Sequence, residues 1–255
     1  MEKCVETARR VGVFKEFHVL ADRPVEGCMC YDACQCDKEA GLFKLHYLKA
    51  GMTKLSFDYF IWVDADSLFM RNPSQVLEAL GRSPLHVPLE VPLSGIQEDV
   101  SWRGVSIFKL RDAFRREGVA NRAYLSESAF WIIHHDAIDH VYELALGFWH
   151  RARGTGLPVD ISHSIGYAMQ VLCGNPEAHL LSARPDLWAS EGVGRPRSSA
   201  ERADTWEWRH PLAQRGIAVR PAIIHVGGTL PCASRVRPFG ESNSTGSNSH
   251  PGKLE

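Results

Sequence analysis

An α/β domain with a mostly parallel central sheet and helices on both faces is the fold class that the sequence predicts. Short apolar runs of strand length, such as YFIWV and AFWII, alternate with longer segments whose apolar residues recur every three or four positions. The short runs are apolar throughout, which is typical of strands buried on both faces of a parallel sheet. A chain of 255 residues, of which 44% are hydrophobic, can bury such a core without disulfides or metal ions to stabilise it.

The first third of the chain is predicted to run helix, strand, loop, helix, strand. EKCVETARRVG has the spacing of a short helix, EFHVLAD that of a strand, and RPVEGCMCYDACQCDKE the composition of a turn-like connection. An amphipathic helix is expected over residues 38–55, followed by the strand YFIWV, which ends at Asp64. The next helix begins near Asn72, a capping residue, with Pro73 at the first helical position and Gln75 able to answer from the third.

The alternation continues toward the carboxyl end. GVSIFKLRDAFRREG and DAIDHVYELALGFWHRARG are predicted helices, the second capped by Asp136, and SAFWIIH is a predicted strand between them. SHSIGYAMQVLCG is a helix that Gly174 stops, and AHLLSA and PAIIHVGG are strands. Residues 184–220, rich in Arg, Trp, Pro and Gly, are expected to form a mobile flap. We therefore expect one domain over residues 1–232 and a disordered tail over residues 233–255.

The charge and the chain ends restrict the class of partner. A formal net charge of -1 gives no overall attraction to nucleic acid or to an anionic membrane, so a phosphate-bearing ligand has to be held by a small local site. The first residues, MEKCVETARRVG, do not have the pattern of a secretory signal, and no later run is apolar enough for a transmembrane segment. A cytoplasmic location with reduced cysteines is the expectation.

Four of the seven cysteines lie close together in CMCYDACQC. Cys28, Cys30, Cys34 and Cys36 form a C-x-C-x3-C-x-C pattern, and four thiolates are a ligand set that Zn²⁺ accepts. The spacing differs from the usual paired C-x2-C, and four ligands within nine residues strain tetrahedral closure. We favour a loop with free thiols over a zinc site.

Two aspartates follow the most apolar of the predicted strands. Asp64 and Asp66 are separated by the small Ala65, and carboxylates at this spacing can turn toward one cation. The plainer interpretation is a polar strand end in which Asp66 caps a turn. Two like charges at the end of an apolar strand repel each other and are costly without a cation to offset them, which favours a site for Mg²⁺ or Mn²⁺.

The segment FKLHYLKAGMTKLSFDYFIWVDADSLFMRNP resembles the core of glycogenin-like glycosyltransferases, whose GT-A fold is a Rossmann-like single domain. In that family a lysine in a K-L-H-aromatic stretch precedes an apolar strand ending in D-x-D. The later IIHVGG is similar to the family's carboxyl-terminal histidine and glycine turn. The resemblance implies a metal-dependent transfer of sugar, with retention, from a nucleoside-diphosphate sugar to an unidentified acceptor. A UDP-sugar is the favoured donor.

The resemblance also implies roles for particular residues. Asp64, Asp66 and His225 are the implied ligands of Mn²⁺ or Mg²⁺, which stabilises the charge that develops on the departing diphosphate. Lys44 is the implied point charge beside the phosphates, and Gly228 permits close approach of the backbone to the nucleotide. For Lys44 and His225 the alternatives are a lysine at the edge of an apolar helix face and a histidine satisfied by backbone groups.

Two further carboxylates are candidate catalytic residues. Asp160, in LPVDISHS, either positions or deprotonates an acceptor hydroxyl or simply precedes a helix capped by Ser162. Glu127, in LSESAF, lies ahead of a strand and either faces the donor sugar or belongs to the surface.

The sequence also departs from the resemblance at its start. GT-A domains begin with a strand whose end holds the nucleotide base, whereas this chain begins with the helix that would follow, so we expect that first strand to be missing from residues 1–255. Either the strand is encoded upstream, or the base is held differently. The alternative function is therefore a non-catalytic or truncated nucleotide-sugar-binding relic of the fold. A phosphohydrolase of the haloacid dehalogenase kind is disfavoured, because Leu68 stands where such enzymes have Thr or Val.

Overall fold

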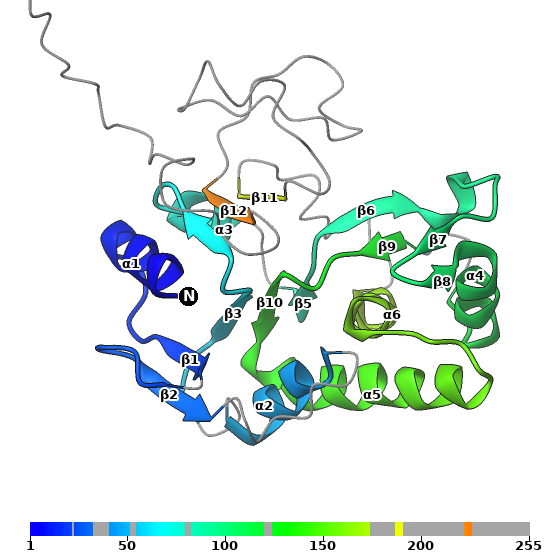
Figure 1. Ribbon diagram of the computed structural model, residues 1–255, viewed down its shortest axis with the longest axis horizontal. Helices are drawn as coiled ribbons and strands as arrows, with labels where there is room; N and C mark the ends of the chain where they lie inside the picture. Colours follow the sequence, from blue (N-terminus) through cyan, green and yellow to red (C-terminus); the bar gives the residue numbers. More distant parts are fainter. Residues whose placement is uncertain are drawn as a thin grey trace, which may run out of the picture.

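The computed structural model describes residues 1–21, 23–32, 41–51, 55–79, 83–119, 124–173, 187–190 and 222–225. Several sequence predictions lie outside these ranges: the strand AHLLSA, the nucleotide contact Gly228, the thiols of Cys34 and Cys36, and the tail over residues 233–255. The described part is α/β, with helices and short strands interleaved along the chain (Figure 1). The predicted class is thus confirmed.

The α-helices of the described ranges match the predicted ones in order. They are α1 (Glu2–Val11), α2 (Phe43–Gly51), α3 (Ser74–Ala79), α4 (Ile107–Arg116), α5 (Ile138–Gly154) and α6 (Ile161–Cys173), with two 3-10 turns, η4 (Leu93–Gly95) and η5 (His135–Ala137).

The strands are shorter and more numerous than the apolar runs predicted. They are β1 (His18–Ala21), β2 (Met29–Asp32), β3 (Tyr59–Val63), β4 (Ser67–Phe69), β5 (Leu85–His86), β6 (Leu89–Pro92), β7 (Ser101–Trp102), β8 (Val105–Ser106), β9 (Tyr124–Ser126), β10 (Phe130–His134), β11 (Trp188–Ser190) and β12 (Ile223–His225).

Capping explains where the helices begin and end. Helix α1 stops at Gly12, whose left-handed φ of 71° lets its N–H bond to the carbonyl of Arg9. The Ser106 hydroxyl accepts the N–H of Lys109 at the start of α4. The predicted cap of α5 was wrong: Asp136 lies in the 3-10 turn η5, and Ala137 occupies the cap position without a side-chain bond.

Strand β10 is the centre of the main sheet and has helices on both faces. It pairs with β3 on one side and β5 on the other. Trp131 and Ile133 pack with α2, α5 and α6 in the larger core cluster, whereas Phe130 and Ile132 pack with α1, β4 and β12 in a second cluster. Because neighbouring residues of a strand point to opposite faces, this alternation shows a sheet with a core on each side.

The predicted parallel pairing holds for β1 with β2 and for β11 with β12. The other described pairs are antiparallel, including β10 with both β3 and β5. Apolar runs interleaved with helices indicate the class, but the direction of each strand depends on the edge to which its connection returns. The apolar pattern does not encode that direction.

Strand β3 was expected to be buried on both faces and is only half-buried. Within the described residues its partner is β10, and its other edge faces a mostly apolar cavity of about 900 Å³ lined by parts of α1, β1, α2 and β3. The cavity extends to Asp64 and Asp66, just past the end of β3. The cavity beside the incompletely buried β3 therefore reaches the candidate site.

Two segments expected to lack regular structure contain strands. The cysteine-rich connection contains β2, parallel to β1, with Cys28 and Cys30 both free thiols. The segment expected to be a mobile flap contains β11. Among the described residues, no helix combines the length and the apolar character that a membrane span requires.

Candidate functional site

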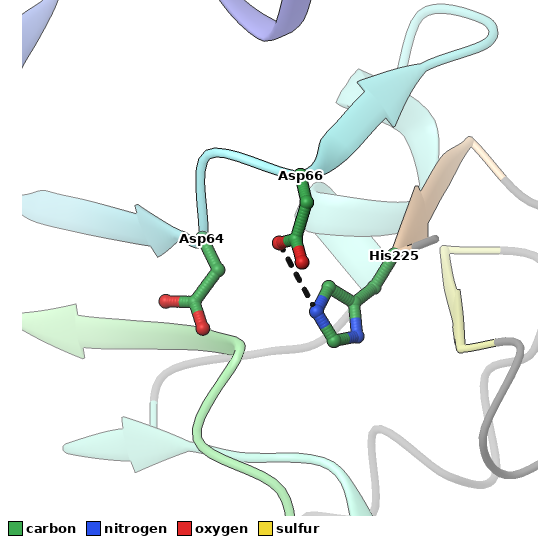
Figure 2. Close-up of side chains that lie close together, drawn as sticks. All are labelled: Asp64, Asp66 and His225. Carbon is green, nitrogen blue, oxygen red and sulfur yellow. Dashed lines mark ion pairs between the residues drawn. The ribbon is translucent and has the colours of Figure 1, made fainter. Parts of the chain in front are cut away.

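Strand pairing brings the turn after β3 next to a residue more than 150 positions away. Strand β12 runs antiparallel to β4, with His225 opposite Ser67, the residue directly after Asp66. His225 Nε2 consequently lies 3.2 Å from Asp66 Oδ1, as Figure 2 shows. On the other side of β12, Trp188 of β11 stacks its ring against the imidazole at 6.1 Å between ring centroids. The imidazole is thus held between Asp66 and an indole.

Asp64, Asp66 and His225 form one group of potential metal ligands (Figure 2). Each offers one ligand atom, and these atoms lie within 4.8 Å of one another. The three side chains are half-buried, with exposed fractions of 30%, 25% and 14% respectively, and Asp64 and Asp66 line the cavity. The structure thus brings together the three residues that the sequence resemblance implied.

Asp64 is fixed by two neighbours. Its Oδ1 accepts a hydrogen bond from Lys44 Nζ at 2.6 Å and another from Trp62 Nε1 at 2.9 Å. Trp62 and Asp64 are two positions apart on an extended chain and therefore point to the same side. The contact with Lys44 is an ion pair between a buried ammonium and a half-buried carboxylate. Lys44 is therefore not a lysine at the edge of an exposed helix face, because its ammonium is buried and paired with Asp64.

Asp66 and His225 shift each other's titration. Burial raises the pKa of Asp66, but the hydrogen bond and charge of His225 outweigh it and hold that pKa below its ordinary value. Burial lowers the pKa of His225, but the hydrogen bond and charge of Asp66 outweigh it and raise that pKa above its ordinary value. The pair therefore favours an ionised carboxylate beside a protonated imidazole.

The donor set fits a divalent cation. An octahedral ion with bonds of about 2.1 Å holds its ligand atoms roughly 3.0 to 4.2 Å apart, a range that small side-chain rotations reach from the present geometry. Two carboxylates and one imidazole are a ligand set for Mn²⁺, and the carboxylates also suit Mg²⁺. A cation in this position would replace the proton that Asp66 and His225 now share.

A second polar cluster centres on Arg103, at the turn between β7 and β8. Arg103 Nη2 lies 2.7 Å and 2.5 Å from the two carboxylate oxygens of Glu127. Glu127 Oε1 also accepts the N–H groups of Ser128 at 2.8 Å and Ala129 at 3.2 Å. Both oxygens of Glu127 are therefore already hydrogen-bonded, and its side chain is only 10% exposed.

Asp160 is the second carboxylate of this cluster. Its Oδ1 accepts the N–H of Ser162 at 2.9 Å and that of His163 at 3.2 Å, so Asp160 rather than the predicted Ser162 caps α6. His163 Nδ1 lies 2.6 Å from the same oxygen, and Arg103 Nη1 lies 3.7 Å from Oδ2. Burial raises the pKa of Asp160, but His163 and then Arg103 lower it more, and the net pKa is below its ordinary value.

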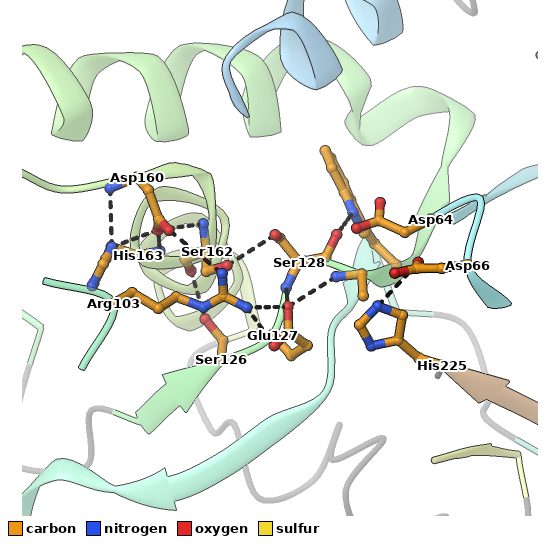
Figure 3. A network of polar contacts seen from close by, with 12 residues as sticks. Asp64, Asp66, Arg103, Ser126, Glu127, Ser128, Asp160, Ser162, His163 and His225 are labelled. Atoms are coloured by element: carbon orange, nitrogen blue, oxygen red, sulfur yellow. Dashed lines mark hydrogen bonds and ion pairs between the residues drawn. The ribbon is translucent and has the colours of Figure 1, made fainter. Parts of the chain in front are cut away.

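The two clusters are connected through the loop that leads into β10, as Figure 3 shows. Lys44 Nζ donates to the carbonyl oxygen of Ser128 at 3.2 Å as well as to Asp64. The Ser162 hydroxyl donates to that of Ser128 at 2.8 Å, and the Ser126 hydroxyl donates to the carbonyl of Ser162 at 2.7 Å. Of the candidate metal ligands, Asp64 is thus connected to the Arg103 cluster by a continuous chain of polar contacts through Lys44 and Ser128.

No role was predicted from the sequence for three residues of these clusters and their surroundings. Arg103 lies in SWRGVS, a stretch with no recognisable motif, and Trp188 lies in a segment expected to be mobile. Trp62 carried a usable signal, because its position two residues before Asp64 predicts that both point to one side of the strand.

No protein-family model matches the sequence, and the search of curated proteins gives no match. Among solved structures, the galactosyltransferase LgtC, crystallised with donor and acceptor sugar analogues, is similar over 89% of this chain and 82% of its own, with 13% identity and a TM-score of 0.51. Mouse xyloside xylosyltransferase 1, in its apo form, is similar over 80% of this chain and 76% of its own, with 14% identity and a TM-score of 0.43. The likeness to the galactosyltransferase shows that this chain has the GT-A fold.

Proposed function

We propose that the protein is a metal-dependent glycosyltransferase that moves a sugar from a nucleoside-diphosphate sugar to an acceptor hydroxyl. In such a reaction the bond from the anomeric carbon to the diphosphate breaks, the acceptor oxygen forms the new bond, and its proton is released. The observation that carries the proposal is the approach of Asp64, Asp66 and His225 to one another beside a large cavity of a GT-A fold.

Asp64, Asp66 and His225 would hold Mn²⁺ or Mg²⁺, and the ion would stabilise the negative charge that develops on the departing diphosphate. The imidazole in the set favours Mn²⁺ over Mg²⁺. Lys44 uses two of its three N–H groups on Asp64 and on the carbonyl of Ser128, so its ammonium lies beside this position and offers a third donor to a phosphate oxygen.

The cavity beside the ligands is a suitable place for the base of the nucleotide. Its walls include the aromatic rings of Phe14, Phe17, Phe43, Tyr47 and Trp62. Flat apolar walls favour a stacked heterocycle, and the adjacent carboxylates and lysine favour the metal-bound diphosphate. A UDP-sugar is the favoured donor by resemblance to glycogenin-like enzymes, and retention is proposed on the same ground.

Glu127 and Asp160 are proposed as hydrogen-bond acceptors for sugar hydroxyls. Glu127 is a poor nucleophile or base, because its two oxygens already bond to Arg103 and to two backbone N–H groups. The lowered pKa of Asp160 keeps it ionised and makes it a weak base. In both residues the charge is therefore better suited to holding a substrate than to taking its proton.

The second candidate function is binding of a nucleotide sugar without transfer. It is favoured by the same observation, since neither Glu127 nor Asp160 offers an unengaged basic carboxylate. Under this hypothesis the protein binds UDP with Mn²⁺ but releases no sugar.

A donor panel tests the proposal. Purified protein is incubated with a series of UDP- and GDP-sugars, with Mn²⁺, with Mg²⁺ or with EDTA, and released nucleotide is measured. We expect release from at least one UDP-sugar that depends on Mn²⁺ and stops with EDTA. Metal-dependent UDP binding without release would favour the second function, and the absence of both would overturn the proposal. The anomeric configuration of the first product, read by NMR, tests retention.

A further inference from the structure

Arg103 has an unfavourable backbone conformation. Its φ is 49°, and that of the following Gly104 is 79°, so both central residues of the turn from β7 to β8 lie in the left-handed region. Two-residue hairpin turns of this kind favour Asn-Gly, because asparagine tolerates positive φ and a long side chain does not. Among the described residues other than glycine, Arg103 is the one with positive φ. A residue retained in such a conformation calls for an account of what its side chain does.

The side chain of Arg103 bridges two elements that are distant in sequence. Its guanidinium contacts both oxygens of Glu127, in the loop between β9 and β10, and lies 3.7 Å from Asp160, at the start of α6. Both carboxylates are more than three-quarters buried, and Arg103 itself is 36% exposed. The turn therefore projects a fixed positive charge between two largely buried negative charges, and the two terminal nitrogens of the planar guanidinium face different carboxylates, Nη2 that of Glu127 and Nη1 that of Asp160.

We propose that Arg103 is a positioning residue of this site: it holds the carboxylates of Glu127 and Asp160 oriented as acceptors for the hydroxyl groups of a substrate sugar. The inference rests on the proposed glycosyltransferase function. It gives a reason for the strained turn, because the residue with the left-handed backbone at position 103 places its guanidinium between Glu127 of the loop and Asp160 at the start of the helix. It also gives Glu127 a role as a hydrogen-bond acceptor whose geometry Arg103 sets.

Charges on every side of Asp160 determine how it titrates. His163 faces it from α6, Arg103 from the turn, and Glu127 lies across the guanidinium. The positive Arg103 contributes to lowering the pKa of Asp160. A carboxylate with a lowered pKa keeps its function above that pKa and loses it as the pH falls through it. Removing the guanidinium raises the pKa of Asp160, so the loss begins at a higher pH.

Arg103→Asn is the informative variant. It removes the guanidinium and at the same time places the residue most favoured for this turn ahead of Gly104, so the backbone of the hairpin gains while the clamp is lost. Arg103→Lys keeps the positive charge and loses the planar guanidinium. Arg115→Gln, on the exposed side of α4, is the control for loss of one positive charge.

The experiment measures three quantities for each protein: the affinity for UDP with Mn²⁺ by calorimetry, kcat and KM for the best UDP-sugar as a function of pH, and the melting temperature. For Arg103→Asn we expect kcat/KM to fall roughly tenfold to a hundredfold, as for a misplaced substrate contact. UDP–Mn²⁺ affinity stays within about twofold of wild type, and the acid limb of the kcat/KM profile moves to higher pH. For Arg103→Lys we expect a kcat/KM between that of Arg103→Asn and that of wild type. Arg115→Gln matches wild type.

Two results would overturn the inference. In one, Arg103→Asn keeps the kcat/KM and the acid limb of the control. In the other, its UDP–Mn²⁺ affinity, melting temperature and activity fall together, which is the mark of a purely structural ion pair. The failure of the proposed function is read separately in the wild-type protein, as metal-dependent UDP binding without sugar release or as no binding.

Discussion

The candidate metal ligands and the Arg103 cluster are two polar regions built by different means. Strand pairing positions Asp66 and His225, because His225 belongs to β12 and Asp66 directly precedes β4, the strand with which β12 pairs. Side-chain ion pairs hold Glu127 and Asp160, through Arg103 and the cap of α6. The first region has carboxylates that still face an open cavity, whereas in the second both oxygens of Glu127 and Oδ1 of Asp160 already accept hydrogen bonds.

The difference separates a region that can accept a new charge from one whose charges are already balanced. Asp64 and Asp66 repel each other and share Lys44 and His225 as partial compensation, so a divalent cation has electrostatic energy to gain there. The guanidinium of Arg103 already occupies the equivalent place beside Glu127 and Asp160. We expect metal to bind to the first region and neutral hydroxyl groups to contact the second.

The largest effect is expected for Asp66→Asn. It removes one of two ligand charges at a half-buried strand end and keeps the shape of the side chain, so we expect metal-dependent turnover to fall at least about a hundredfold with the fold intact. Turnover with titrated Mn²⁺ and the far-UV circular dichroism spectrum check this outcome. Asp58→Asn, on the exposed segment before β3, is the matched control and leaves turnover unchanged. Full activity of Asp66→Asn would remove the metal-site argument.

Gly166→Ala perturbs the other region through packing. A Cβ at this buried position of α6 would collide with the Ser126 hydroxyl and lie 2.9 Å from the Ser126 Cβ, so the helix that begins at Asp160 has to shift. We expect a loss of about 2 kcal/mol in the free energy of unfolding, measured with urea. Gly154→Ala, in the last turn of α5 with nothing within 4 Å of its Cβ, is the control and costs no stability. Equal stability of the two variants would contradict the close packing of α6 on β9.

Sequence alone predicted more of the fold than of its pairing. The strand Tyr59–Val63 was predicted with its bounds, and the helices α4 and α6 were placed to within a few residues, because apolar period and caps are local signals. Short strands such as β5, β7 and β8 carry too few residues to show a period. Strand direction and the division of the core between the two faces of β10 depend on contacts between distant segments, which no local pattern contains.

The same division applies to the site. Asp64, Asp66 and His225 stood at predicted strand ends, whereas the pairing of β12 with β4, which brings His225 to Asp66 across two different sheets, was not predictable from either segment. Arg103 gave no signal, because an arginine before a glycine reads as an ordinary surface turn. Its importance rests on the positive φ and on two carboxylates 24 and 57 positions further along the chain.

The affinity of the candidate site for Mn²⁺ is expected to depend on pH through His225. The hydrogen bond and charge of Asp66 outweigh burial and raise the pKa of His225, and a histidine must be neutral to bind a metal, so bound metal displaces a proton from this pair. Below the raised pKa, Mn²⁺ affinity falls by about tenfold per pH unit, and above it the affinity levels off. Calorimetry in two buffers of different ionisation enthalpy measures the released proton directly. Binding of Mn²⁺ without proton release at pH values below the raised pKa of His225 would place the ion away from His225.

Trp62→Phe is expected to have the smallest effect, and it tests whether the hydrogen bond from the indole helps to orient Asp64 for metal binding. The substitution keeps an aromatic ring in β3 and removes the N–H that donates to Asp64 Oδ1 at 2.9 Å, while the hydrogen bond from Lys44 to that oxygen remains. A hydrogen bond of this kind contributes about 1 kcal/mol, which corresponds to a loss of roughly fivefold in Mn²⁺ affinity. Trp131→Phe provides the comparison, because its N–H donates to the carbonyl of Ser128 at 2.8 Å and not to a ligand carboxylate. If Trp62→Phe binds Mn²⁺ no more weakly than Trp131→Phe does, the indole has no part in orienting Asp64, and the ion pair with Lys44 is sufficient.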